Sequence, residues 1–305
     1  MFLQTYGVTD ALCLRLVRKY GNSAKTILET EPYRIIREVK GIGFKTADKI
    51  ALNLGLASNG PARIDAGVLH TLQESEDEGH SHVERRELAL NAANLLEADA
   101  EDVENRIDAL MNEGELVTSK PDWVQHPNAA RAEETLVRCL KNQSQAASSL
   151  PPIQVEKAII WAQEKAGFSF ADQQAEAVRQ ALQSKISILT GGPGTGKTTI
   201  LRALVSILRA KKTRILLAAP TGRAARRMAE SCSHFAQTVH RLLKFDPSQG
   251  GFTMNEQNPL TCDFVIMDEA SMLDLRLAAA LIRSIPPKAH LLLVGDADQL
   301  PSVGS

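Results

Sequence analysis

A glycine-rich stretch between an apolar run and a helical pattern constrains the fold of this chain more than any other feature. Residues 191–198 read Gly-Gly-Pro-Gly-Thr-Gly-Lys-Thr and match the pattern GxxxxGK(S/T). The apolar run Ile186 to Leu189 precedes the stretch and a helical pattern follows it, which is the context that this pattern requires. Glycines let backbone N–H groups surround phosphates at a helix N-terminus, where the helix dipole favours anions. The sequence therefore predicts a phosphate-binding loop.

Four apolar runs divide the second half of the chain in the manner of a buried parallel sheet. Stretches with helical patterning separate them, so strand and helix alternate along the sequence. This alternation predicts a right-handed, doubly wound α/β fold whose ligands bind at the carboxyl ends of the strands. The runs are Ile186 to Leu189, Ile215 to Ala218, Phe264 to Met267 and Leu291 to Val294.

Polar side chains follow these runs at the edge where the glycine-rich loop is expected. Asp268 and Glu269 come directly after the third run, and Gln299 follows the fourth. We expect Lys197 to reach the β and γ phosphates of ATP, and Gln299 to sense the γ-phosphate. The Thr198 hydroxyl and Asp268 are expected to hold Mg²⁺, while Glu269 orients and deprotonates the attacking water.

The first half of the chain lacks this alternation and reads as helical. Residues 1–60 contain short helical segments separated by glycines, which predicts a tandem helix-hairpin-helix region. Residues 61–127 give three helical stretches followed by two short strands around a turn, the order of a winged helix. Residues 128–152 read as a connecting helix and a linker rich in Gln, Ser, Ala and Pro, and residues 153–305 form the α/β domain.

Composition and charge narrow the class of protein. Hydrophobic residues make up 44% of the 305-residue chain, enough for more than one core. The sequence has no run of 18 apolar residues and no signal-peptide pattern, so we expect a cytoplasmic location and no membrane association. The four cysteines are scattered singly and read as free thiols. Residues 1–60 and 151–305 carry net charges of +4 and +5 and residues 61–150 carry −10, which is weak support for nucleic-acid binding at the basic ends.

The motifs after residue 170 resemble those of superfamily 1 helicases, and specifically the RecD/TraA family of DNA helicases. The resemblance implies a RecA-like fold for residues 153–305. It also implies ATP-dependent unwinding of DNA in the 5′ to 3′ direction, with Mg²⁺ as the cofactor. The motifs that carry it are the Q motif ending in Gln174 and Ala177-Val178, the glycine-rich loop from Gly191 to Thr199, Ala219 to Ala225, Thr238 to Leu243, Asp268 to Ser271 and Gly295 to Gly304.

The same resemblance assigns roles to individual residues. Thr221, Arg223 and His240 are implied to lie on the single-stranded DNA side of the motor domain. Arg226 and Arg227 either add positive charge there or serve only as the solvated surface of a helix, and His240 alternatively packs at a helix start. Gln174 is expected to read adenine through its amide. The nucleotide-binding set is Gln174, Gly192, Gly194, Thr195, Gly196, Lys197, Thr198 and Thr199.

The front of the chain resembles the longer members of this family, which carry a helix-hairpin-helix region ahead of the motor. Gly41-Ile42-Gly43, followed by Lys45 and Lys49, is the clearest hairpin. By resemblance, backbone N–H groups at Gly41 and Gly43, together with Lys45, contact a DNA phosphate without reading sequence. A helix-turn-helix packing unit without DNA contact is the alternative interpretation.

The resemblance also implies partners and a limit on activity. The partners would be single-stranded DNA and duplex DNA ends, with a single-strand-binding protein or a nuclease complex, in DNA repair and recombination. Superfamily 1 helicases use a second RecA-like domain whose arginines stabilise the transferring phosphoryl group. The given chain stops at Ser305, before motifs of such a domain, so we expect ATP binding with negligible turnover by this chain alone.

Two other functions fit parts of the pattern. A non-motor, ATP-sensing DNA-binding module would use the hairpins and the winged helix, with ATP as a switch. The motor segment of a conjugative relaxase would share the motor motifs, but that class carries a His-rich nuclease domain upstream. Gly79-His80-Ser81-His82 reads as a loop and not as part of such a domain.

Overall fold

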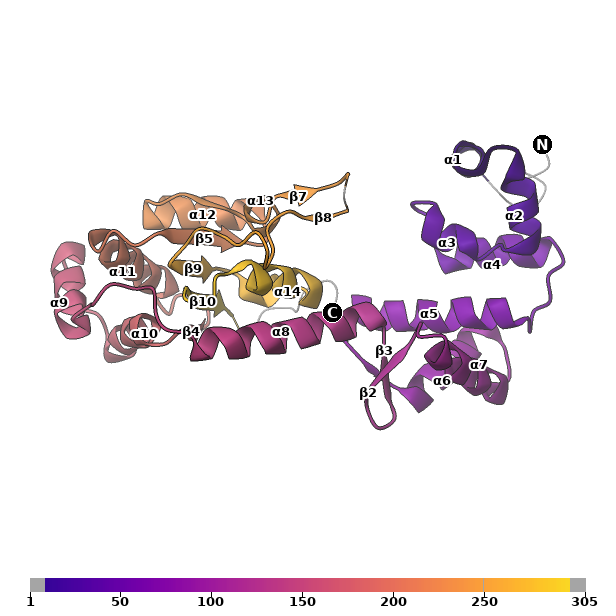
Figure 1. Ribbon diagram of the computed structural model, residues 1–305, viewed down its shortest axis with the longest axis horizontal. Coiled ribbons are helices and arrows are strands. Elements are labelled where there is room, and N and C mark those ends of the chain that lie inside the picture. Colours follow the sequence, from indigo (N-terminus) through magenta and orange to yellow (C-terminus); the bar gives the residue numbers. More distant parts are fainter. Residues whose placement is uncertain (1–8, 249, 297–305) are drawn as a thin grey trace. The chain divides into compact units, whose positions relative to one another are not determined.

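The computed structural model describes residues 9–248 and 250–296 (Figure 1). The chain divides into two compact units, unit 1 over residues 1–130 and unit 2 over residues 131–305. Across the described residues, no helix combines the length and the apolar character needed to cross a bilayer.

Short helices separated by glycine-containing turns form the first part of unit 1. They are α1 (Asp10–Tyr20), the 3₁₀ turn η2 (Gly21–Ser23), α2 (Ala24–Thr30), α3 (Arg34–Glu38) and α4 (Phe44–Asn53). Leu16, Leu28, Ile35 and Ile50 belong to the small core between them. Gly41, in the loop before α4, has a φ of +81°, a conformation that favours glycine. This part therefore has the helical architecture that the glycine pattern predicts.

The rest of unit 1 has the element order of a winged helix. Its elements are α5 (Pro61–Asp77), β1 (Val83–Glu84), α6 (Arg85–Leu96), α7 (Ala100–Asn112), β2 (Val117–Lys120) and β3 (Trp123–Gln125). The strands form an antiparallel sheet in the order β1-β3-β2. Gly67 lets α5 and α6 approach closely, because a Cβ at this position would lie 2.7 Å from the side chain of Leu96. Leu72, Leu88 and Ile107 lie in the core that the three helices share.

A buried ion pair joins the two parts of unit 1. Arg63 of α5 donates from Nε and Nη2 to the two carboxylate oxygens of Asp48, at 2.8 and 3.0 Å. Its Nη1 donates to the carbonyls of Ser58 and Leu96, at 2.7 and 2.8 Å. The Tyr33 hydroxyl donates to Asp48 at 2.7 Å, and burial together with this carboxylate raises the pKa of Tyr33. The hairpin part and the winged-helix part are thus fixed to one another by one charged cluster.

Unit 2 is built on a five-stranded parallel sheet in the order β4-β10-β9-β5-β6. The strands are β4 (Ile186–Thr190), β5 (Ile215–Ala219), β6 (Ala236–Thr238), β9 (Phe264–Met267) and β10 (His290–Gly295). Four of them coincide with the predicted apolar runs. The fifth, β6, escapes prediction because its three residues include two polar ones and lie at the sheet edge, where they form no apolar run.

Helices cover both faces of this sheet (Figure 1). They are α8 (Pro127–Gln145), α9 (Val155–Ala166), α10 (Asp172–Gln183), α11 (Lys197–Ala210), α12 (Gly222–Cys232), α13 (Val239–Leu242), the 3₁₀ turn η3 (Ala270–Met272) and α14 (Leu275–Ser284). Phe264 and Ile266 of β9 face the core with α9 to α12, while Val265 and Met267 face the core with α13 and α14. A separate antiparallel hairpin consists of β7 (Phe245–Asp246) and β8 (Gly251–Phe252).

The segment between α8 and α9 is bound to the sheet. The composition of residues 142–152 predicts a linker, but α8 continues to Gln145. Beyond it, the Ser148 hydroxyl lies 2.7 Å from Nε2 of the buried His290, whose Nδ1 lies 2.9 Å from the carbonyl of Ser184. Since a carbonyl only accepts, the neutral ring donates from Nδ1 and accepts from Ser148. Burial lowers the pKa of His290, which favours this neutral form.

Candidate functional site

The glycine-rich loop connects β4 to α11 at the carboxyl edge of the sheet. Gly194 and Gly196 have φ values of +82° and +90°, which residues with side chains rarely adopt. Gly196 is also the N-cap of α11, and a Cβ there would lie 2.2 Å from Nε2 of Gln174. The loop curls over the N-terminus of a 14-residue helix, where free N–H groups and the helix dipole favour phosphate.

Hydrogen bonds within the loop and to Gln174 hold this curve. The Thr195 hydroxyl donates to the carbonyl of Gly192 at 2.9 Å, and the Lys197 ammonium donates to the same carbonyl at 3.1 Å. The Gln174 amide donates from Nε2 to the carbonyl of Thr195 at 3.3 Å, and its oxygen accepts from the N–H of Ala171 at 3.2 Å. Gln174 therefore connects α10 to the loop. This structural role is additional to the recognition of adenine that the sequence predicts for its amide.

Asp268 and Glu269 follow β9 at the same edge of the sheet. The N–H of Asp268 donates to the carbonyl of Ala218 on the adjacent strand β5 at 2.9 Å, and the N–H of Glu269 donates to Oδ1 of Asp268 at 3.0 Å. Burial raises the pKa of Asp268, while the N–H of Glu269 and the ammonium of Lys197 act in the opposite direction. Because β4 and β9 are parallel strands of one sheet, separated by β10, the loop after β4 and the carboxylate after β9 lie at the same edge.

The end of β10 lies between the loop and this acidic pair. Gly295 pairs in register with Thr190, the last residue before the loop. A Cβ on Gly295 would lie 3.4 Å from the N atom of Ser271, so β10 passes close to the turn after Glu269. Gln299, predicted to sense the γ-phosphate, lies outside the described residues.

The donor groups at this edge fit Mg²⁺. Thr198 lies exposed on the first turn of α11, and Asp268 supplies a carboxylate. The hydroxyl of Ser271 is buried without a hydrogen-bond partner among the described residues. Mg²⁺ prefers such oxygen ligands and needs only one or two from the protein when phosphates and water supply the rest.

A pocket of about 260 Å³ lies beside the first turns of α11. Thr199, predicted to bind nucleotide, lines it together with Lys165 and Arg202. Phe168 and Phe170 complete it, with ring centroids 5.8 Å apart. The sequence interpretation included Phe170 only as the first residue of the stretch that carries the Q motif, and it missed Phe168.

The residues predicted to face single-stranded DNA begin with the loop after β5. Thr221 is the N-cap of α12, and its hydroxyl accepts from the N–H of Ala224 at 3.2 Å. Arg223 is exposed on the first turn of the same helix. Arg226 pairs with Glu230 at 3.0 Å, which agrees with the alternative that it serves as solvated helix surface.

His240 lies in a cluster of three rings at the surface of unit 2. Its ring centroid is 6.0 Å from that of Phe245 and 5.6 Å from that of Phe252, and the two phenylalanines are 5.3 Å apart. His240 is exposed, and 46% of Phe245 is exposed. The sequence interpretation missed both phenylalanines. Pro247 and the Gly250-Gly251 pair between them are the turn signals that would have indicated a hairpin.

The predicted hairpin residues of unit 1, Gly41, Gly43 and Lys45, are all exposed at the start of α4. Arg15 of α1 donates to the carbonyl of Lys40 at 2.9 Å, and a Cβ on Gly41 would lie 2.7 Å from its guanidinium. Arg15, which the sequence interpretation missed, thus stabilises the hairpin loop through its hydrogen bond to Lys40. It also places a positive charge next to the loop.

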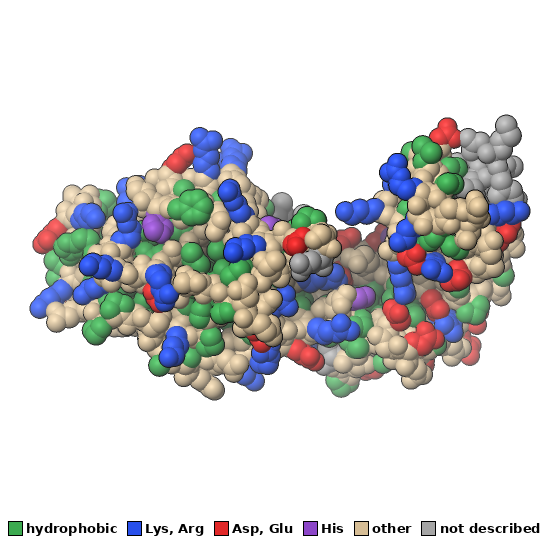
Figure 2. Space-filling view, turned by 45° about the horizontal axis from the view of Figure 1, so that its top comes forward, with side chains coloured by type: hydrophobic (Ala, Val, Ile, Leu, Met, Phe, Trp, Pro, Cys, Tyr) green, Lys and Arg blue, Asp and Glu red, His purple; other side chains and the backbone are tan. Residues whose placement is uncertain are grey.

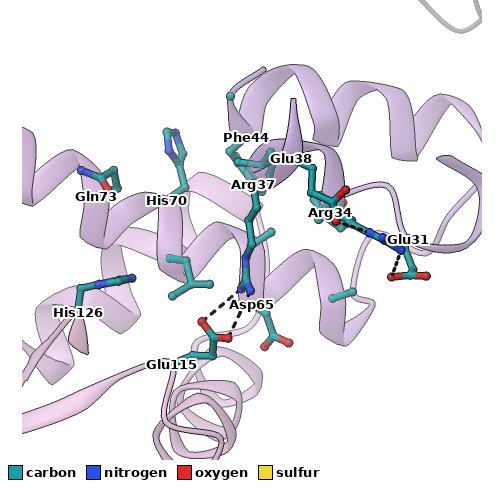
Figure 3. Close-up of a pocket in the computed structure, with 16 residues that line it drawn as sticks. Glu31, Arg34, Arg37, Glu38, Phe44, Asp65, His70, Gln73, Glu115 and His126 are labelled. Atoms are coloured by element: carbon teal, nitrogen blue, oxygen red, sulfur yellow. Dashed lines mark hydrogen bonds and ion pairs between the residues drawn. The ribbon is translucent and has the colours of Figure 1, made fainter. Parts of the chain in front are cut away.

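A second pocket, of about 790 Å³, lies within unit 1 between α3, α4 and α5 (Figure 3). Arg34 on its wall pairs with Glu38 at 2.6 Å, and Arg37 pairs with Glu115 at 3.3 Å. The rings of Phe44 and His70 stack at 5.1 Å. Because both arginines already have carboxylate partners, this pocket has little attraction for phosphate, and we do not assign the nucleotide to it despite its larger volume.

Replacing Gly196 with alanine is expected to weaken ATP binding about 10-fold or more. The added Cβ would collide with Gln174 and would occupy a positive φ that alanine adopts only with strain. Titration with a fluorescent ATP analogue measures the effect. Gly222→Ala is the matched control, because its Cβ would meet nothing within 4 Å and its φ is not in the left-handed region. Equal affinities in the two variants would show that the loop conformation is not required.

Two families of known domains match the chain. The ATP-dependent RecD2 DNA helicase HHH domain matches residues 1–82, and an AAA domain matches residues 174–305. These matches cover the hairpin part and most of the α/β domain respectively.

Individual relatives agree with both matches. The ATP-dependent RecD2 DNA helicase of Deinococcus radiodurans is 33% identical over 320 residues, which cover 99% of this chain and 43% of the relative. The RecBCD enzyme subunit RecD of Mycobacterium tuberculosis is 40% identical over 155 residues, or 43% of this chain and 27% of the relative. The subunit of the same name from Haemophilus influenzae is 40% identical over 156 residues, or 43% and 24%. The chain spans less than half the length of these relatives.

Proposed function

Because this chain belongs to the RecD-like family of superfamily 1 helicases, with an N-terminal helix-hairpin-helix region, we propose that it works in the ATP-dependent unwinding of DNA. The observation that carries the proposal is the convergence of Lys197, Asp268 and Gly295 at one edge of the parallel sheet. Ligands of doubly wound sheets bind at this edge.

Each group at this edge has a separate task. The Lys197 ammonium neutralises part of the charge of the β and γ phosphates, and the N–H groups at the start of α11 donate hydrogen bonds to phosphate oxygens. Thr198 and Asp268 would hold Mg²⁺, which supplies charge neutralisation between the phosphates. Glu269 orients the attacking water and takes its proton. Gln299 remains our proposal for the sensor of the γ-phosphate.

The strand on which the motor acts is proposed to cross the carboxyl ends of β5 and β6. Thr221 and Arg223 lie at the start of α12, which follows β5, and His240 lies in α13, which follows β6 directly, next to the exposed ring of Phe245. Bases of single-stranded DNA stack on aromatic rings with little sequence preference, while arginines attract the backbone. This combination fits single-stranded DNA better than sequence-specific recognition of a duplex.

The hairpin loop of unit 1 is proposed to hold the backbone of duplex DNA near its end, through Gly41, Gly43 and Lys45. We further propose 5′ to 3′ polarity, and action with a single-strand-binding protein or a nuclease complex in DNA repair and recombination. The last proposal is supported by relatives whose names describe them as subunits of the RecBCD enzyme.

Glu269→Gln is expected to leave the affinity for ATP within about 3-fold of the unchanged protein. The rate of hydrolysis is expected to fall at least about 100-fold, which is the lower end of the rate enhancement that a general base typically contributes. Single-turnover hydrolysis with the protein in excess measures even a slow rate. Glu230→Gln, an exposed glutamate paired with Arg226, is the matched control and should hydrolyse ATP as the unchanged protein does. Hydrolysis at the unchanged rate in Glu269→Gln would remove this residue as the base.

The proposed function is tested by two titrations of the unchanged chain, one with a fluorescent ATP analogue and one with labelled single-stranded DNA at two salt concentrations. We expect ATP binding that requires Mg²⁺, and DNA binding that weakens steeply with salt because counterions are released from phosphates. Failure to bind the analogue with Mg²⁺ would overturn the nucleotide site. DNA binding without salt dependence would overturn the proposed backbone contacts.

A further inference from the structure

The third helix of the winged-helix part, α7, presents an acidic face. In helix-turn-helix proteins the N-terminal residues of the corresponding recognition helix approach the DNA. In α7 these positions are Glu101 and Asp102, both exposed, and Glu104 and Asp108 continue the exposed face. Asp99 precedes them, and its side chain accepts from the N–H of Glu101 at 2.9 Å. The part of the fold that would enter a groove is therefore lined by carboxylates.

Basic side chains close to α7 are engaged by carboxylates of the same unit. Arg106 donates from Nε and Nη2 to the two oxygens of Asp65, both at 2.7 Å. Arg85 lies 2.7 Å from Asp108, and that pairing lowers the pKa of the Asp108 carboxyl. These arginines neutralise protein carboxylates and have correspondingly less attraction for DNA phosphates.

Neither the wing, formed by β2 and β3, nor residues 61–127 as a whole carry enough positive charge to offset the carboxylates of α7. Lys120 at the end of β2 has its ammonium 5.9 Å from the centroid of the Trp123 ring, and the turn that follows contributes the exposed carboxylate of Asp122. Residues 61–127 contain five Lys and Arg against sixteen Asp and Glu, a net charge of −11. In Figure 2 acidic side chains gather at the lower right, over the part of unit 1 that contains α5 to α7.

We infer that DNA contacts unit 1 through its hairpin part alone, and that the acidic face of α7 keeps the phosphate backbone away from the winged helix. The inference rests on the proposed DNA binding of the hairpin. Non-specific affinity for DNA comes from the neutralisation of phosphates, so a segment with a net charge of −11 and an exposed acidic helix face opposes binding. The hairpin part carries +4, with Lys40 and Lys49 exposed beside the loop. Attraction by the hairpin part and repulsion by α7, within one compact unit, would orient the duplex.

The buried Asp48–Arg63 pair connects the hairpin part to the winged-helix part. It fixes α4, which follows the hairpin loop, to α5 of the winged-helix part. Lys45 of α4 also lies 3.7 Å from Glu74 of α5, an exposed pair that DNA would have to break if Lys45 turns to a phosphate. Lys40 and Lys49 are therefore the better probes of the hairpin's charge.

A photocrosslinking amino acid placed at Thr46 or at Asn105, one at a time in the whole chain, tests the inference. Both positions are exposed, the first on α4 beside the hairpin loop and the second on the acidic face of α7. With a duplex that has a single-stranded tail, we expect crosslinks from position 46 and at least about tenfold fewer from position 105. Comparable yields from both positions would overturn the inference and leave the proposed function intact.

Two charge variants complete the test. Lys40→Gln with Lys49→Gln is expected to weaken DNA binding about tenfold and to reduce the magnitude of the salt slope by about 2, since two phosphate contacts are lost. Glu101→Gln, Asp102→Asn and Glu104→Gln together are expected to leave the affinity unchanged or to raise it. A loss of affinity in this triple variant would overturn the inference. Unchanged binding in the hairpin variant, with no crosslinks from position 46, would overturn the proposed hairpin contact and the inference with it.

Discussion

Lys197→Ala is expected to weaken ATP binding at least about 100-fold, or roughly 2.7 kcal/mol. The ammonium lies at the loop, where it bonds to the carbonyl of Gly192 and acts on Asp268. A charge-assisted bond to phosphate is about twice as strong as a neutral one, and no other lysine of β4, the loop or α11 can replace it. The measurement is titration with a fluorescent ATP analogue in the presence of Mg²⁺.

The matched control for this variant is Lys185→Ala at the opposite end of β4. The Lys185 ammonium donates to the carbonyls of Lys288 and Ala289, at 2.6 and 3.0 Å, so its loss perturbs the base of the sheet. Its removal is expected to lower stability and to leave ATP affinity within about 2-fold, because charge effects fall off with distance and solvent screening. Equal losses of affinity in both variants would point to general destabilisation and contradict the proposed role of Lys197.

Arg63→Ala is expected to lower the free energy of unfolding of unit 1 by about 3–5 kcal/mol, the usual cost of breaking a buried ion pair. The variant leaves the buried carboxylate of Asp48 with the Tyr33 hydroxyl as its remaining side-chain partner, and it leaves the carbonyls of Ser58 and Leu96 without their donor. This loss is a large fraction of the stability of a domain of this size.

The two tryptophans allow the loss to be measured in the whole chain. Trp123 lies in unit 1 and Trp161 in unit 2, so Trp161→Phe leaves one fluorescent reporter of unit 1 during unfolding by urea. Arg34→Ala is the control, because this arginine is 43% exposed and its pairs with glutamates are expected to contribute less than about 1 kcal/mol. A similar loss in both variants would show that the buried cluster is no more important than a surface pair.

The sequence predicted the glycine-rich loop between β4 and α11 because the conformation of this loop depends on local geometry. Gly194 and Gly196 occupy positive φ values that glycine alone adopts readily, and Lys197 must begin the helix that follows. The acidic pair at Asp268 was predictable for the same reason, since parallel strands end at one edge of the sheet. Gln299 lies beyond the described residues, and its role stays a prediction.

The features that the sequence did not reveal involve residues far apart along the chain. The cluster of His240, Phe245 and Phe252 forms because a hairpin folds back onto α13. The strand β6 is too short to show a pattern of its own, and it is defined by its pairing with β5. Neither feature has a local signal strong enough to predict the contact.

The sequence by itself determined the class of this protein. It predicted a glycine-rich loop on a parallel sheet and, earlier in the chain, a helical part with hairpin glycines. These features are predictable because glycine conformations and buried strands are encoded within a few residues. Tertiary structure alone decided how these parts act together. It closed Gln174 over the loop, placed the Ser148 segment on His290, and joined the hairpin to the winged helix through Asp48 and Arg63. Each of these contacts joins residues that lie from 15 to 142 positions apart, so no local sequence pattern specifies it.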